Sequence, residues 1–217
     1  MAEVVKFYNE GGWGMHLVSA CLLASIGITI ERIKVLYMDA NENKTALLKG
    51  INENIMRGDV QGAIRFVSSQ KDGPLARILK AGLMKANRPD KEIQAALDQA
   101  SLSEVPMIEK NTGFLAVLSN AATLAALLGT IAGLIKTFKS VSGDVPAAEK
   151  AKLLSEGISE AMHCTAYGLG TAVPVLVAYA IMQSKTQHIL EAINESVVAE
   201  INFVLESRAV KGGSSAA

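Results

Sequence analysis

Three long stretches of the 217-residue chain contain no Asp, Glu, Lys or Arg: residues 11–30, 113–135 and 161–184. An α-helix needs roughly 20 apolar residues to cross a hydrocarbon core about 30 Å thick. A helix on the surface of a soluble protein would instead show a polar face at every turn. The pattern therefore predicts an all-α membrane protein with three transmembrane helices.

The polar stretches between these helices define the remaining parts of the chain. The predicted divisions are an outer N-terminal segment (1–10), transmembrane helix 1 (11–30), a helical domain (31–112), transmembrane helix 2 (113–135), a short outer loop (136–156), transmembrane helix 3 (157–184), a C-terminal helix (185–211) and a disordered tail (212–217).

The distribution of Lys and Arg predicts the orientation in the membrane. Thirteen of the 21 basic residues lie between Arg32 and Lys110, and Arg32 and Lys34 directly follow the first helix. Basic residues near the ends of membrane helices favour the cytoplasmic side. We therefore expect the N-terminus outside, the helical domain and the C-terminal helix in the cytoplasm, and the 136–156 loop outside.

Start and stop signals predict several helices in the cytoplasmic domain. Apolar residues at helical spacing predict a helix from Asn43 to Arg57, and Asp59 can cap the next one. Pro74 is typical of a first helical turn, and Asp90 begins a long amphipathic helix. The last of these helices is expected to continue into transmembrane helix 2, with a local adjustment at Pro106.

Composition excludes several classes of function. The 21 basic and 21 acidic residues balance, so the chain lacks the basic excess of a nucleic-acid-binding protein. Cys21 and Cys164 both fall inside predicted spans and form neither a disulfide framework nor a metal motif. Nucleotide-binding loops and zinc-protease motifs are absent from the sequence. We expect no enzyme, no metal and no cofactor.

Hydroxyl and small residues mark the second and third helices. Thr123, Thr130 and Thr137 recur every seven residues and so share one helix face, and Gly129 and Gly133 allow close helix approach. The third helix carries a stripe of small residues with one hydroxyl: Ala161, Thr165, Gly168 and Ala172. These threonines either bond to the carbonyl of their own preceding turn and pack helices, or line a polar path.

Two further residues of the third helix stand out. Pro174 interrupts the backbone hydrogen bonds and is expected to bend the helix. Glu160 lies at the edge of the span, where a carboxylate is either functional or simply hydrated. A proton path through lipid needs a group that titrates, and no span has a central acid. If the chain conducts ions, the titrating group is expected on a partner helix.

At these residues the chain resembles the MotA/TolQ/ExbB family of proton-channel subunits. The similar segments are LLGTIAGLIKTF at 127–138 and GISEAMHCTAYGLGTAVPVLV at 157–177. Three spans with a long inner tail are closer to the TolQ/ExbB branch than to MotA, which has four. His163 and Cys164 depart from the small or apolar residues that are usual there.

The resemblance implies long helices assembled as a pentameric ring in the bacterial inner membrane. A dimer of a single-span partner of the ExbD, TolR or MotB type would occupy the lumen and supply the protonatable Asp. Thr130 and Thr165 would line the proton path, Glu160 would be the family's acidic residue, and proton flow would drive mechanical work. The Tol, Exb and gliding-motor branches stay open, as does proton versus sodium.

Two rival classes remain beside this interpretation. A non-conducting scaffold would use its Thr and Gly faces for helix packing alone. A secondary transporter would show internal repeats and broken helices, which three unequal spans do not favour.

Overall fold

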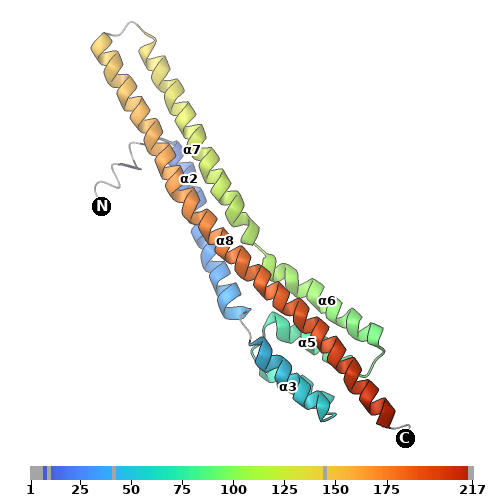
Figure 1. Cartoon of the computed structure of the whole chain (residues 1–217). Helices are drawn as coiled ribbons and strands as arrows, with labels where there is room; N and C mark the ends of the chain where they lie inside the picture. Colours follow the sequence, from blue (N-terminus) through green and yellow to red (C-terminus); the bar gives the residue numbers. More distant parts are fainter. Residues whose placement is uncertain (1–6, 9–10, 41–42, 144–145, 215–217) are drawn as a thin grey trace. The chain divides into compact units, whose positions relative to one another are not determined.

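The computed structural model describes residues 7–8, 11–40, 43–143 and 146–214 (Figure 1). These residues form helices joined by short connections, and no strand occurs among them. Three helical stretches, Gly14–Met38, Asp90–Val141 and Ala147–Val204, are long and apolar enough to cross a membrane. The prediction of an all-α protein with three long apolar helices is confirmed.

The chain divides into two compact units. The first comprises residues 1–31 and 111–181, and the second comprises residues 32–110 and 182–217. Helix α2 (Gly14–Ile33) and the long helix α8 (Ala147–Ser214) contribute residues to both units.

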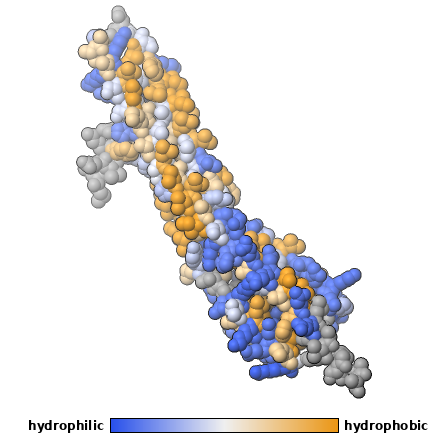
Figure 2. Space-filling model, in the orientation of Figure 1, coloured by the Kyte–Doolittle hydropathy of each residue, from blue (hydrophilic) through white to orange (hydrophobic). Residues whose placement is uncertain are grey.

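The first unit is built from α2, α7 (Thr112–Val141) and the first part of α8. Small side chains fill the space between these helices, and its buried cluster consists of Val18, Ala122, Ala126 and Ala172. Many of the large apolar side chains point outward: Leu23 is 70% exposed and Leu124 is 65% exposed, whereas Met15 and Leu115 are buried. Figure 2 shows hydrophobic residues gathered over this unit, as expected of helices that face lipid or other subunits.

The helices of this unit extend beyond the predicted spans. Helix α7 reaches Val141 and α8 begins at Ala147. Much of the predicted 136–156 loop is therefore helical, and the connection between the two helices is shorter than predicted. Lys136 and Lys139 lie inside α7, because lysine is a good helix former and is favoured near a helix C-terminus. Helix α8 also runs through Pro174 without interruption and continues to Ser214, past the predicted boundary at residue 211.

The second unit begins with the π-helix η1 (Lys34–Asp39) and then holds α3 (Lys44–Met56), α4 (Val60–Ser69), α5 (Pro74–Leu83) and α6 (Asp90–Glu109). Helix α3 packs against α4, α4 against α5, and α5 against α6. The predicted helix starts are confirmed: the side chains of Asn43 and Asp59 accept bonds from the Ala46 and Gly62 amides at 3.2 and 2.7 Å.

The expected adjustment at Pro106 is wrong in position. Pro106 lies inside α6, and the helix ends three residues later at Glu109. The chain turns at Asn111, whose φ of 63° is the left-handed conformation that Asn adopts more readily than most residues. The side-chain Nδ2 of Asn111 donates to the two Glu31 carboxylate oxygens at 3.0 and 3.2 Å.

Candidate functional site

Helices α7 and α8 lie against each other in opposite directions, and their small residues bring the backbones close. A Cβ atom at Gly168 would overlap the Ala126 side chain, and one at Gly157 would overlap Thr137. A Cβ at Gly133 would meet only the Ala161 Cβ, at 3.9 Å, which is an ordinary contact. A side chain therefore has less room at Gly168 than at Gly133, and the packing role of both glycines remains a prediction.

The two predicted path residues meet at this interface. The Thr130 Oγ1 of α7 lies 2.5 Å from the Thr165 Oγ1 of α8, and both side chains are half-buried. Thr130 Oγ1 also lies 2.9 Å from the Ala126 carbonyl oxygen and 3.2 Å from that of Ala161. Thr165 Oγ1 lies 3.3 Å from the Ala161 oxygen. Two hydroxyls and two backbone carbonyls thus form one polar cluster between apolar helices.

The chemistry of this cluster follows from its hydrogens. Each threonine hydroxyl carries one proton and two acceptor lone pairs. If Thr130 donates to the Ala126 oxygen, Thr165 can donate to Thr130; if Thr165 donates to the Ala161 oxygen, Thr130 can donate to Thr165. In either arrangement a lone pair stays open to an outside donor. The pair can therefore accept a hydrogen bond from water or a protonated carboxyl group without changing its own charge.

The other two threonines of the row differ from Thr130. Thr123 is exposed and its hydroxyl donates to the Ser119 carbonyl oxygen of its own helix at 3.1 Å. Thr137 is buried and donates to the Gly133 oxygen at 2.9 Å. Among the residues that the structure describes, Thr130 is the one member of this row whose hydroxyl makes a hydrogen bond to α8. The seven-residue spacing therefore places one of its three members in the site.

Glu160 precedes Thr165 by five residues on α8 and lies beside Gly12. Its side chain is half-buried, and a Cβ atom at Gly12 would collide with its Oε1. Gly12 has a φ of 70°, which glycine adopts without strain. Glu160 also lines an open polar cleft with residues of both helices, including Lys136, Ser140 and Glu156. Its predicted part as a charge partner remains a prediction.

A second network of polar side chains was not predicted from the sequence. The Tyr8 hydroxyl lies 2.7 Å from His16 Nδ1, and the Ser19 hydroxyl lies 3.4 Å from that of Tyr8 and 3.1 Å from that of Tyr167. The bond between Ser19 and Tyr167 links α2 to α8. Polar residues inside the first apolar stretch, His16 and Ser19, were the available signal.

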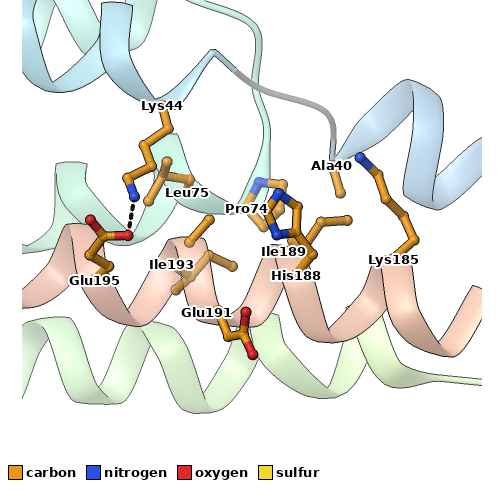
Figure 3. A pocket seen from close by; sticks show the side chains of 11 residues that line it. Ala40, Lys44, Pro74, Leu75, Lys185, His188, Ile189, Glu191, Ile193 and Glu195 are labelled. Carbon is orange, nitrogen blue, oxygen red and sulfur yellow. Dashed lines mark hydrogen bonds and ion pairs between the residues drawn. The ribbon is translucent and has the colours of Figure 1, made fainter.

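The second unit contains a cavity of about 310 Å³ between Ala40, the start of α3, the start of α5 and α8 (Figure 3). Its lysines have partners within the chain. Lys44 forms an ion pair with Glu195, and the Lys185 ammonium lies 5.4 Å from the centre of the Tyr37 ring. The charges of Glu191 and Glu195 offset those of the lysines, so the cavity shows no excess charge for a ligand.

Residues 70–195 match the MotA/TolQ/ExbB proton channel family. This region covers more than half of the chain and includes α5 to α7, the threonine pair and Glu160. The chain belongs to this family.

Individual relatives agree with this assignment. The chain is 32% identical over 123 residues to an ExbB-like biopolymer transport protein of Synechocystis, which covers 57% of this chain and 59% of the relative. It is 24% identical over 177 residues to an ExbB homologue of Methanothermobacter thermautotrophicus (81% and 61%). It is 32% identical over 171 residues to the Tol-Pal system protein TolQ of Haemophilus influenzae (72% of each).

Membership of the MotA/TolQ/ExbB family fixes the general class of the protein. The family consists of inner-membrane, proton-channel-like subunits of transport and cell-envelope systems, and the three apolar helices fit membrane spans. The chain spans about three fifths of the length of the Synechocystis and Methanothermobacter relatives.

Proposed function

We propose that the chain is a ring-forming subunit of an inner-membrane motor that couples the proton-motive force to mechanical work. The observation that carries this proposal is the contact between Thr130 and Thr165, two hydroxyls brought to 2.5 Å between apolar helices. Burying polar groups in a membrane costs free energy unless they are hydrogen-bonded. Polar groups in such a place often mark a functional site. Its open lone pair suits a proton carried past it.

The proton carrier is assigned to a partner. Threonine hydroxyls do not titrate in the physiological range, and the predicted spans contain no central carboxylate. A single-span partner of the ExbD or TolR type, present as a dimer in the lumen of a pentamer of this chain, would supply the Asp. Thr130 and Thr165 would accept a hydrogen bond from that carboxyl group while it is protonated, and so lower the cost of its passage.

The arrangement in the membrane belongs to the same proposal. The N-terminus and the turn between α7 and α8 lie outside, and the helical domain and the C-terminal part of α8 lie in the cytoplasm. The 13 basic residues between Arg32 and Lys110 support this orientation. The predicted division of the chain into spans, outer segments and cytoplasmic parts is retained here as a proposal.

A non-conducting scaffold is the competing function, and one observation favours it. Both hydroxyls lie within hydrogen-bond distance of carbonyl oxygens of the chain itself, those of Ala126 and Ala161. If these bonds serve packing alone, removing a hydroxyl should leave transport intact and weaken assembly.

Proton flux separates the two functions. The chain is co-reconstituted with its single-span partner in liposomes, and flux is measured under an imposed pH gradient. We expect Thr130→Val or Thr165→Val to lower the flux roughly 2- to 13-fold, because a hydrogen bond to a neutral group contributes about 0.5–1.5 kcal/mol. Valine keeps the shape of threonine, so the ring should stay assembled.

The matched control is Thr123→Val, which makes the same change on the same helix at a hydroxyl bonded only within α7. Its flux should stay within about twofold of the wild type. Normal flux from Thr165→Val would favour the scaffold, and so would a Thr165→Val variant that no longer assembles into a ring. Glu160→Gln in the same assay tests the carboxylate at the edge of the span, and unchanged flux would make it a hydrated boundary residue.

The nature of the load and of the ion follow from further arms of this assay. The relatives named for biopolymer transport and for the Tol-Pal system leave both loads open for this chain. A proton-driven complex should conduct equally with and without sodium. Flux that requires a sodium gradient would reassign the ion and leave the two threonines as its ligands.

A further inference from the structure

The start of α2 lies against α7 and α8 next to the threonine pair. Gly14 is buried, and a Cβ atom placed on it would lie 2.8 Å from the Gly129 Cα and 2.8 Å from the Cys164 Sγ. Distances under 3.0 Å are essentially absent between real Cβ atoms and their neighbours. Three helices therefore meet at one point where a side chain on α2 has no room.

Gly14 contacts two residues, and each of them comes immediately before one of the two threonines of the pair. Gly129 comes before Thr130 on α7, and Cys164 comes before Thr165 on α8. The Ala126 carbonyl oxygen joins the same network, since it lies 2.9 Å from the Thr130 hydroxyl and 3.6 Å from the Cys164 Sγ. A displacement at this point would thus be passed to both threonines through one residue of backbone.

We propose that Gly14 is a positioning residue for the Thr130–Thr165 pair: its missing side chain lets α2 lie against Gly129 and Cys164 and so sets the separation of the two hydroxyls. At 2.5 Å this separation is at the short end for an O–H···O bond, and such bonds are lost beyond about 3.5 Å. A shift of one helix by the width of a methyl group is enough to break it. The first membrane helix, which contributes neither threonine, then acts on the path through packing.

Several other glycines of the same helices have room for a side chain, unlike Gly14. A Cβ at Gly27 of α2 or at Gly170 of α8 would meet nothing within 4 Å, and one at Gly133 would make an ordinary contact. Gly27→Ala is therefore a matched control: the same helix and the same added methyl group, without the contact. Gly14 is the first residue of α2 and Gly27 lies in its interior, so the gain in helix propensity from Ala applies mainly to Gly27. The two variants are therefore compared by the separation of the hydroxyl positions and not by stability.

A disulfide reporter measures the separation without any transport assay. Thr130→Cys and Thr165→Cys together place two sulfurs where the hydroxyls now touch, and oxidation followed by peptide mapping identifies this cross-link despite the native cysteines. Adding Gly14→Ala should slow its formation roughly five- to thirtyfold, the factor expected of an overpacked contact. Adding Gly27→Ala should leave the rate within about twofold. A reporter that fails to cross-link, or equal rates for both variants, would overturn the proposal.

A second test removes the Cys164 thiol and asks whether this restores cross-linking in a Gly129→Ala variant. This comparison does not require the Gly14→Ala variant to fold. A Cβ at Gly129 would lie 2.6 Å from the Cys164 Sγ but 3.1 Å from the Gly14 Cα. In the reporter, Gly129→Ala should slow cross-linking, and Cys164→Ala should restore most of the rate. Cys164→Ala should not rescue Gly14→Ala, because the Gly129 backbone remains in contact. Rescue of both variants, or of neither, would contradict the geometry.

The consequence for conduction rests on the proposed function and is read separately. In liposomes with the partner, Gly14→Ala should lower proton flux by the same factor as it lowers cross-linking, and Gly27→Ala should not. A conducting wild type with an unaffected Gly14→Ala variant would overturn the positioning role alone. Absence of flux from the wild type would overturn the proposed function, while the cross-linking result would still decide whether Gly14 sets the separation.

Discussion

At the scale of single residues, the least typical group of the second unit is Glu200. It lies on α8 beyond the predicted end of the third span at Ser184, and it is 1% exposed. Neither carboxylate oxygen has a hydrogen-bond partner among the described residues. Burial without compensation disfavours the charged form, and it raises the pKa of Glu200 from 4.5 to about 7. Glu200 therefore makes the stability of this unit depend on pH near neutrality.

The sign of this dependence follows from proton binding. Between about pH 4.5 and pH 7 the folded chain keeps the Glu200 proton and the unfolded chain has released it. Stability from this residue is complete below pH 4.5 and is lost as the pH rises through 7, by roughly 3 kcal/mol in total. We expect Glu200→Gln to flatten the fall in melting temperature between pH 5.5 and 8, measured in detergent by thermal unfolding. The exposed control Glu191→Gln should keep the slope of the wild type, and an unchanged slope in Glu200→Gln would contradict the assignment.

The residues of the candidate site were predictable to different degrees. Thr130 and Thr165 follow from the family motif, but their contact depends on how α7 and α8 are rotated about their axes, which spacing along one helix does not determine. Thr137, seven residues from Thr130, illustrates this: it bonds within α7 and lies against Gly157. The role of Gly14 could not be predicted for the same reason, since it arises where three helices cross.

At the scale of secondary structure, the boundaries of helices were predictable where a side chain caps them. Asn43 and Asp59 accept bonds from backbone amides of the first turn, as their identities indicate. The helix from Asp90 was expected to continue into the second span with a local adjustment at Pro106, and this is wrong. Helix α6 runs through Pro106, because a helix can lose one hydrogen bond and continue, and it ends at Glu109. The break between α6 and α7 falls at Asn111. This residue has a positive φ, which a helix does not allow, and its side chain bonds to Glu31.

Asn111 offers a test of which of these two properties makes the break. Asn111→Gly keeps the backbone conformation and loses only the bonds to Glu31, whereas Asn111→Val loses the bonds and also adds strain at a positive φ. We expect Asn111→Val to lower stability by about 1–3 kcal/mol more than Asn111→Gly, measured as the difference in thermal unfolding in detergent. Equal losses in the two variants would assign the whole effect to the Glu31 bonds.

At the scale of the whole molecule, the orientation in the membrane decides which side supplies protons to the candidate path. The described chain offers two exposed positions that the proposed topology places on opposite sides. Ser142 lies in the turn after α7, and Gln70 lies at the end of α4 in the helical domain. Both are exposed and polar, so cysteine at either position should leave the packing unchanged.

Labelling with a membrane-impermeant maleimide then reads the topology directly. Because basic residues concentrate between Arg32 and Lys110, we expect Ser142→Cys to react in intact spheroplasts and Gln70→Cys to react only after the membrane is permeabilised. The wild type reports any background from Cys21 and Cys164, which lie in α2 and α8 and are half-buried and buried. The reverse labelling pattern would invert the chain, place Glu160 and its polar cleft on the cytoplasmic side, and require protons to enter the path from the opposite end.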